Sequence, residues 1–172
     1  MSNQLKYAGI GSRGAPVEAL STMSIIAMWL AQEKDATLVS GGADGSDTAF
    51  ENGAKIVGGK TEIWLPHLKF NKHPSTLLPS PDAFLVAPRY VPHWKSCGDF
   101  ARRAHARNCH QVLGADLLTP VSFVVAWTYK GERIGGTATA LNCAEDHGVP
   151  ILNLGSKDWT EYEIIDFLER WS

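Results

Sequence analysis

Residues 37–49 read TLVSGGADGSDTA, which is a short apolar run, a glycine-rich turn and the start of a helix-like segment. The same order of features recurs around residues 11–14 (GSRG) and residues 135–139 (GGTAT). The first N–H groups of a helix have no partner within the helix and carry a partial positive charge, and glycine lets a ligand approach them closely. Three such turns predict a site for a phosphate-bearing ligand.

Short apolar runs alternate with helix-length segments along the chain. Strands are expected at residues 7–10, 37–40, 62–65, 122–127 and 150–154. Helices are expected at residues 17–33, 46–57, 99–112, 137–147 and 159–171, several with apolar residues at the spacing of one helical face. Strands that alternate with helices predict a parallel sheet covered on both faces, and therefore an α/β fold.

Length and composition predict one domain over residues 1–172, because 172 residues with 44% hydrophobic content are enough for a substantial core. A formal net charge of −2 excludes a uniformly basic coat for nucleic acid, although it leaves room for a local basic strip. Three cysteines are a sparse, odd set that favours reduced thiols, and no apolar run reaches the length of a membrane span. We therefore expect a cytoplasmic protein without a membrane partner.

Residues 66–98 form the irregular part of the chain, with prolines at 74, 79, 81, 88 and 92. Helical and strand periodicity are lost there. A connection of this length is usually functional or mobile. We therefore expect a proline-rich insert at about 66–98 that folds over or beside the binding site.

The turn at residues 9–14 matches the pattern G-x-G-x-x-G directly after an apolar run. The dinucleotide-binding version also has an acidic residue at the end of the second strand, and this chain has Ser40-Gly41-Gly42 there. The pattern therefore favours phosphate binding over NAD, and no cofactor is expected. A tight turn that needs glycine only for its shape is the alternative, but Arg13 favours phosphate because a guanidinium binds phosphate in a bidentate manner.

The other two turns offer acids and hydroxyls. Asp44 and Asp47 lie beside Ser46, where carboxylates are suited to bind ribose hydroxyls or to stabilise an oxocarbenium-like centre. Helix capping by Ser46, with Asp47 in the first turn, is the alternative. In the third turn, a capped helix start explains Thr137 and Thr139 but not the paired glycines before them.

Basic and aromatic residues interleave between residues 89 and 110, where Arg103 and Arg107 lie at helical spacing with His110. Such a strip is typical of single-strand or nucleotide binding, and a solvated charged face is the alternative. Cys97, His105, Cys109 and His110 follow no structural zinc spacing, so no metal site is expected.

On these residues the chain resembles the DprA/Smf–LOG (SLOG) superfamily of Rossmann-like proteins. Residues 37–49 resemble the DprA/Smf signature, residues 7–14 its first strand and turn, and residues 124–127 with 135–137 its later strand and turn. Residues 106–114 are similar to uncharacterised, often phage-encoded members, which makes Arg107 and Asn108 binding candidates. The resemblance implies a Rossmann-like three-layer α/β/α sandwich with a mainly parallel sheet in the order 3-2-1-4-5. Ligands in such a sheet bind beyond the carboxyl ends of the strands, at the switch between strands one and four.

The resemblance implies a binding protein for a phosphorylated nucleotide or a nucleic-acid end. The candidate binding residues are Gly11, Ser12, Arg13, Gly41, Gly42, Ser46, Arg107, Asn108, Gly135, Gly136, Thr137 and Thr139. One alternative is a LOG-like N-glycosidic hydrolase acting on nucleoside monophosphates. It would use Asp44, Asp47 or Glu145, because Asn142 stands where LOG hydrolases have a glutamate. Another is DprA-like single-stranded DNA binding in recombination. The sequence leaves open whether turnover occurs, and whether the strongly apolar segment 159–171 forms a homo-oligomer interface.

Overall fold

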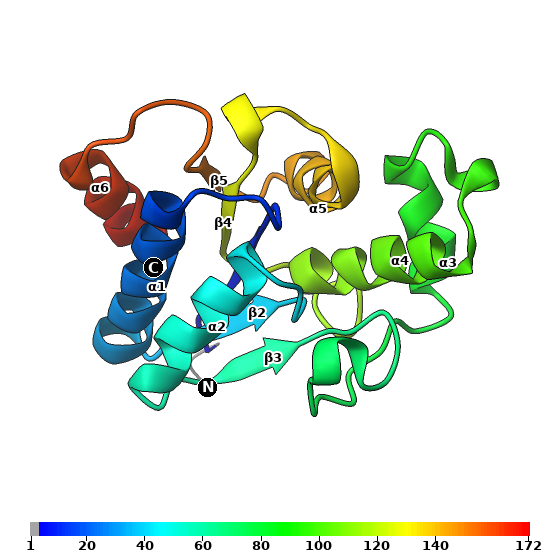
Figure 1. Ribbon diagram of the computed structural model, residues 1–172, viewed down its shortest axis with the longest axis horizontal. Coiled ribbons are helices and arrows are strands. Elements are labelled where there is room, and N and C mark those ends of the chain that lie inside the picture. The colour runs from blue at the N-terminus through cyan, green and yellow to red at the C-terminus, as the bar shows by residue number, and fades with distance from the viewer. Residues whose placement is uncertain (1–3) are drawn as a thin grey trace.

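The computed structural model describes residues 4–172 and contains one sheet of five parallel strands (Figure 1). The strands are β1 (Lys6–Gly11), β2 (Thr37–Ser40), β3 (Thr61–Ile63), β4 (Phe123–Trp127) and β5 (Ile151–Asn153). Their order in the sheet is β3-β2-β1-β4-β5, which confirms the predicted topology. In the register of the sheet, Ala8 of β1 lies between Val39 of β2 and Val124 of β4.

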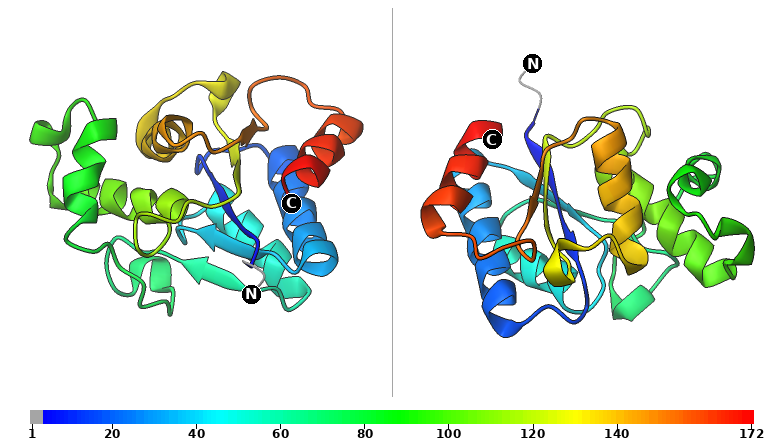
Figure 2. Two further views of the ribbon diagram at one scale, coloured as in Figure 1. Left: turned by 180° about the vertical axis from the view of Figure 1, so that it is seen from behind. Right: turned by 90° about the horizontal axis from the view of Figure 1, so that it is seen from above.

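Helices cover both faces of this sheet, as the three-layer prediction required (Figure 2). On one face lie α1 (Val17–Lys34), α2 (Ser46–Ile56) and α6 (Glu161–Trp171). On the other lie α4 (Asp99–Leu113) and α5 (Gly135–Asp146). Helix α5 begins two residues before the predicted start, at Gly135, whose φ of 70° is a conformation that favours glycine.

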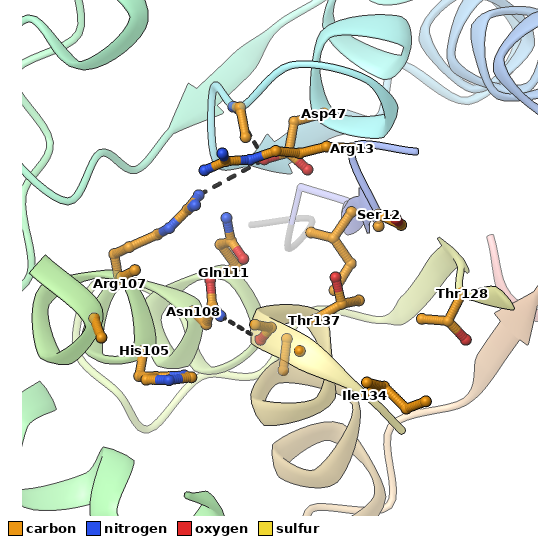
Figure 3. A pocket seen from close by; sticks show the side chains of 18 of the residues that line it. Ser12, Arg13, Asp47, His105, Arg107, Asn108, Gln111, Thr128, Ile134 and Thr137 are labelled. Carbon is orange, nitrogen blue, oxygen red and sulfur yellow. Dashed lines mark hydrogen bonds and ion pairs between the residues drawn. The ribbon is translucent and has the colours of Figure 1, made fainter. Parts of the chain in front are cut away.

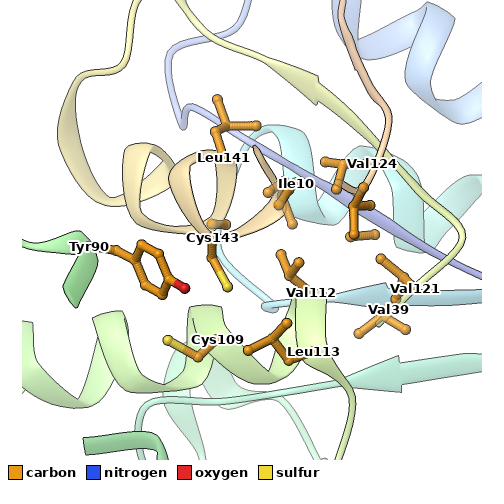
Figure 4. Packing of buried hydrophobic residues seen from close by; sticks show 14 of the residues in the cluster. Ile10, Val39, Tyr90, Cys109, Val112, Leu113, Val121, Val124, Leu141 and Cys143 are labelled. Atoms are coloured by element: carbon orange, nitrogen blue, oxygen red, sulfur yellow. The ribbon is translucent and has the colours of Figure 1, made fainter. Parts of the chain in front are cut away.

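Alternation along the strands builds two separate cores. Tyr7, Phe123 and Leu152 point toward α1, α2 and α6. Ile10 and Val124 point to the other face, where they pack with α4 and α5 (Figure 4). Because both faces of every central strand are buried, the strands read as continuous apolar runs, which is the pattern that identified them in the sequence.

The segment between β3 and α4 holds only short elements: the 3₁₀ turns η1 (Phe70–Lys72), η2 (Ala87–Tyr90) and η3 (Trp94–Ser96), and the four-residue helix α3 (Ala83–Val86). An isolated bridge between Trp64 and Leu77 ties its beginning to the end of β3. Helix α3 packs on α4, and the segment lies beside the first turns of α4 in Figure 1. Across residues 4–172, no helix combines the length and the apolar character that a membrane crossing needs.

The chain reverses its direction of winding between β1 and β4. The connection after β1 leads to α1 on one face, and the connection after β4 leads to α5 on the other. The carboxyl ends of the two strands are adjacent, because Gly11 pairs with Trp127. Two connections that part in this way leave a crevice between them, where open α/β sheets bind ligands.

Candidate functional site

A cleft of about 710 Å³ opens at this point, between the turn after β1, helix α4 and the start of α5. The structure brings many of the candidate residues together around it (Figure 3). Those that line the cleft are Gly11, Ser12, Arg13, Asp47, Arg107, Asn108, Gly135, Gly136 and Thr137. Residues from four segments that are far apart in the sequence therefore share one cavity, whose volume suits a small-molecule ligand.

The turn after β1 presents Arg13 to this cleft. The backbone N–H of Ser12 donates to the carbonyl of Trp127 at 3.0 Å, and the Ser12 hydroxyl accepts from the N–H of Gly14 at 3.1 Å. These bonds hold the turn against β4. Arg13 itself is exposed and, among residues 4–172, has no acidic side chain within ion-pair distance.

The start of α5 forms the opposite wall. Asn108 on α4 donates from Nδ2 to the carbonyl of Gly136 at 2.7 Å, which ties this start to α4 (Figure 3). Within residues 4–172, the N–H groups of Gly136 and Thr137 have no hydrogen-bond partner. These are the free amides and the positive dipole end that an anion needs.

Behind these two walls lies a buried ion pair. Arg107 on α4 is 8% exposed and Asp47 on α2 is 4% exposed, and Arg107 Nη1 lies 3.7 Å from Asp47 Oδ2. The same carboxylate oxygen accepts from the N–H of Ala43 at 3.2 Å. Burial raises the pKa of Asp47 and lowers the pKa of Arg107, and the charge of each partner opposes the shift in the other. The nearby Arg13 adds to the lowering of the Arg107 pKa.

Gly41 makes room for this pair. A Cβ atom at Gly41 would overlap the guanidinium of Arg107 and the amide of Gln111. In the amide orientation that satisfies both ends of Gln111, its oxygen accepts from Arg107 Nη1 at 2.9 Å and from the N–H of Gly41 at 3.0 Å. The glycine is needed here for space inside the protein.

Three candidate residues of the turn at residues 41–47 are closed off from the cleft. Gly41, Gly42 and Ser46 are buried and lie outside the cleft lining. Ser46 does not cap α2, because Gly45 occupies the N-cap position and the Ser46 hydroxyl donates to the carbonyl of Ser12 at 2.7 Å. The hydroxyl thus fixes the first turn against α2.

Of the three carboxylates considered for catalysis, Asp47 alone lines the cleft. Asp44 is exposed and accepts from Asn71 Nδ2 at 2.9 Å, outside the lining. Glu145 lines a separate surface hollow and lies 3.2 Å from Arg133, which also donates to Asn142. The geometry separates both of these acids from the residues that line the cleft.

The basic strip is divided by the fold. Arg103 is exposed and pairs with Asp99, whereas Arg107 is buried behind the cleft. His110 is 0% exposed, and its ring stacks on Trp64 with centroids 4.2 Å apart. The residues follow helical spacing as predicted, but this side of α4 turns into the core as it approaches the sheet, so they form no continuous charged face.

Several cleft residues were not among the predicted binding residues, among them His93, His105, Gln111, Thr128 and Ile134. Thr128 follows β4 directly, and its N–H donates to Asn153 Oδ1 at 3.1 Å. Its place at the carboxyl end of a central strand was the signal that would have identified it. Gln111 lies one helical turn after Arg107, which is a weaker signal.

The fold and the cleft at its topological switch define the class: a Rossmann-like α/β protein with a ligand crevice at the carboxyl edge of the sheet. No protein-family model and no curated protein matches the chain. Among solved structures, the chain is similar to DNA processing protein A from Helicobacter pylori, with a TM-score of 0.56 and 19% identity over 96% of this chain and 72% of that one. That structure was described for its binding of single-stranded DNA.

A second similar structure is the Moco carrier protein of Chlamydomonas rheinhardtii, with a TM-score of 0.55 and 17% identity over 98% of this chain and 84% of that one. The two proteins have different ligands by their descriptions, a DNA strand and a molybdenum cofactor. The shared property is the fold, and the function of this chain has to be argued from its own cleft.

Proposed function

We propose that the cleft binds a phosphorylated nucleotide or the phosphorylated end of a nucleic acid. The observation that carries this proposal is the exposed guanidinium of Arg13, which lines the cavity and, among residues 4–172, has no acidic partner within ion-pair distance. Arg13 and Arg107 lie close enough for their charges to interact, and Asp47 pairs with Arg107. The free amides of the α5 start lie across the same cleft. An anion between these walls would relieve the repulsion and complete the hydrogen bonding.

The contacts suggest a division of roles. A phosphate group lies between the guanidinium of Arg13 and the amides of Gly136 and Thr137, where exposed charge and helix start meet. Asp47 uses one carboxylate oxygen for Ala43, and its other oxygen is available to accept from a ribose hydroxyl. Arg107 positions Asp47 from behind. The half-buried base lies nearer the mouth, beside the apolar side chains of Phe100 and Ile134.

Equilibrium titration by calorimetry with a panel of nucleoside mono-, di- and triphosphates tests the proposal. We expect at least one member to bind, and Arg13→Ala to weaken it about 10- to 100-fold, because a charge-assisted hydrogen bond contributes about 1.5–3 kcal/mol. Arg170→Ala is the matched control, since Arg170 is an exposed arginine of α6 that pairs with Asp166. Absence of binding at millimolar concentration across the panel would refute the proposal.

A hydrolase acting on nucleoside monophosphates is the second candidate, and Asp47 is the observation in its favour. This buried carboxylate faces the cavity, and burial raises its pKa as in many catalytic carboxyl groups. Release of free base, abolished by Asp47→Asn with nucleotide affinity retained, would support turnover. Intact substrate after prolonged incubation with the wild-type chain would leave binding as the function.

Single-stranded DNA is a third candidate ligand, supported by an aromatic surface at the mouth of the cleft. Phe100 is 48% exposed, lines the cleft and lies 6.1 Å from Phe70, which contacts His67 edge-on at 5.5 Å. Bases stack on such groups without sequence preference. DNA binding here predicts affinity that falls with salt and weakens about 10-fold or more in Phe100→Ala, since each stacked base contributes about 1–3 kcal/mol. Salt-independent binding, or full affinity in this variant, would exclude the surface.

A further inference from the structure

His93, Cys97 and His105 meet at one side of the cleft. One ligand atom from each of the three side chains lies within 4.8 Å of the other two. His93 and His105 also line the cavity. None of the three has a part in the phosphate contacts described above, and the proline-rich segment and helix α4 both contribute to the group.

The local fold builds this cluster from two pieces. The 3₁₀ turn η3 separates His93 from Cys97, with the N–H of Ser96 donating to the His93 carbonyl at 2.9 Å and the N–H of Cys97 donating to the Trp94 carbonyl at 3.1 Å. This turn brings two donors that are four residues apart onto one side. His105 comes from the second turn of α4 and faces them.

Thr139 orients His105 in a way that leaves one ring nitrogen available. The Thr139 hydroxyl lies 2.7 Å from His105 Nδ1, and this threonine of α5 is 2% exposed. Over residues 4–172, Nε2 of His105 has no hydrogen-bond partner. A partner on one nitrogen fixes the ring and its tautomer, which is the usual arrangement around histidines that bind metals.

We propose that His93, Cys97 and His105 bind a zinc-type transition-metal dication, with an open coordination position turned toward the cleft. Two imidazoles and one thiolate are a ligand set that Zn²⁺ prefers. A tetrahedral ion holds such donors about 3.4–3.6 Å apart, so side-chain rotations that move the donor atoms by about 1 Å close the site. Three protein ligands with a free fourth position are typical of zinc sites that also bind a substrate atom or water.

The placement explains why the sequence did not reveal the site. The cysteine-histidine set drawn from the sequence contained Cys109 and His110, which are buried in the core around α4. His93 belongs to the irregular segment and was not in that set. The metal would add positive charge to the cleft beside that of the arginines. Its open position would bind a water molecule or a phosphate oxygen of the ligand.

Titration of the chelator-treated full chain with Co²⁺ tests the proposal. We expect one ion per chain, a thiolate-to-cobalt charge-transfer band and the intense d–d bands of tetrahedral Co²⁺, with Zn²⁺ displacing the cobalt. His93→Ala and Cys97→Ser should weaken binding by more than about 10- to 100-fold. Thr139→Val should weaken it by about 10- to 100-fold, which is typical when a metal-binding histidine loses the hydrogen bond that orients it. His93 is exposed, so its variant should fold even if a substitution at buried His105 does not.

His67→Ala is the matched control, because His67 is an exposed histidine outside the cluster. The proposal is overturned if Co²⁺ binds without the charge-transfer band, if Cys97→Ser retains wild-type affinity, or if wild type binds no Co²⁺ at millimolar concentration. The test is independent of the nucleotide proposal. Arg13→Ala should leave Co²⁺ affinity unchanged, so either proposal can fail while the other stands.

Discussion

Two glycine turns of similar sequence have opposite surroundings in this structure: one is open to the cleft and the other is filled by side chains. The open turn, residues 135–137, begins α5 and faces the cleft, and a Cβ atom at Gly135 or Gly136 would meet nothing within 4 Å. The closed turn, residues 41–47, leads into the first residues of α2, and a Cβ atom at Gly41 would overlap Arg107 and Gln111. One pair of glycines leaves backbone amides free for a ligand. The other leaves space for a buried guanidinium.

The difference shows that a glycine-rich turn before a helix is a binding feature only when no part of the protein already occupies it. In the closed turn, Ser12, Ala43 and Gln111 satisfy the groups that a ligand would otherwise use. Its role is to hold Arg107 and Asp47 in place at the inner wall of the cleft. The open turn retains unpaired N–H groups, and we expect it to hold the anion.

The largest expected effect on stability comes from replacing Arg107, the cation that packs against the closed turn. Arg107→Met leaves the Asp47 carboxylate buried without its partner, which should cost about 3–5 kcal/mol of unfolding free energy. Burial raises the pKa of Asp47, and the variant loses the charge that opposes this rise. A raised folded-state pKa gives stability that is present below the unfolded value of about 4 and is lost as pH rises through the folded value.

Urea unfolding at pH 5 and pH 8 checks this, and the loss in Arg107→Met should be greater at pH 8. Adding Asp47→Asn to the variant removes the unpaired charge and should abolish the extra pH dependence. If Arg107→Met loses the same unfolding free energy at both pH values, Asp47 does not carry a buried, unpaired charge in the variant.

Filling the closed turn is the next test. Gly41→Ala places a methyl group where Arg107 and Gln111 lie, and overpacking of this kind costs about 1–3 kcal/mol. Nucleotide affinity should fall as well, because Arg107 positions Asp47. Urea midpoints and calorimetry measure the two effects. A Gly41→Ala protein with wild-type stability would show that the turn has room and is not closed by α4.

The smallest effect on stability is expected in the open turn, where the change should stabilise the protein and not destabilise it. Gly136→Ala adds a methyl group in free space at a residue without positive φ, so helix propensity should stabilise the protein by about 0.5–1 kcal/mol. The same methyl group should weaken nucleotide binding, since it stands where an anion approaches the amides. Greater stability with unchanged affinity would place the anion elsewhere in the cleft.

The fold was largely predictable because it depends on local features. The runs that became β1, β2 and β4 are apolar on both faces, and the prediction placed each within a residue or two. Strand β3 and helix α5 began one or two residues earlier than expected. The segment 66–98 was identified only as irregular, because its 3₁₀ turns have no period that distinguishes them in a sequence.

The sequence by itself determined the alternation of strands and helices and the presence of three helix starts with glycine, since apolar runs and turn residues act over short stretches of chain. The strand order was implied by the family resemblance and is confirmed by the structure. The tertiary structure decided which start is open, because that depends on whether a side chain such as Arg107, far away in the sequence, fills the space left by Gly41. It also decided that His93 joins Cys97 and His105, which no spacing rule connects. Vacant space and convergent ligands are properties of packing, and packing brings together residues that the linear order keeps apart.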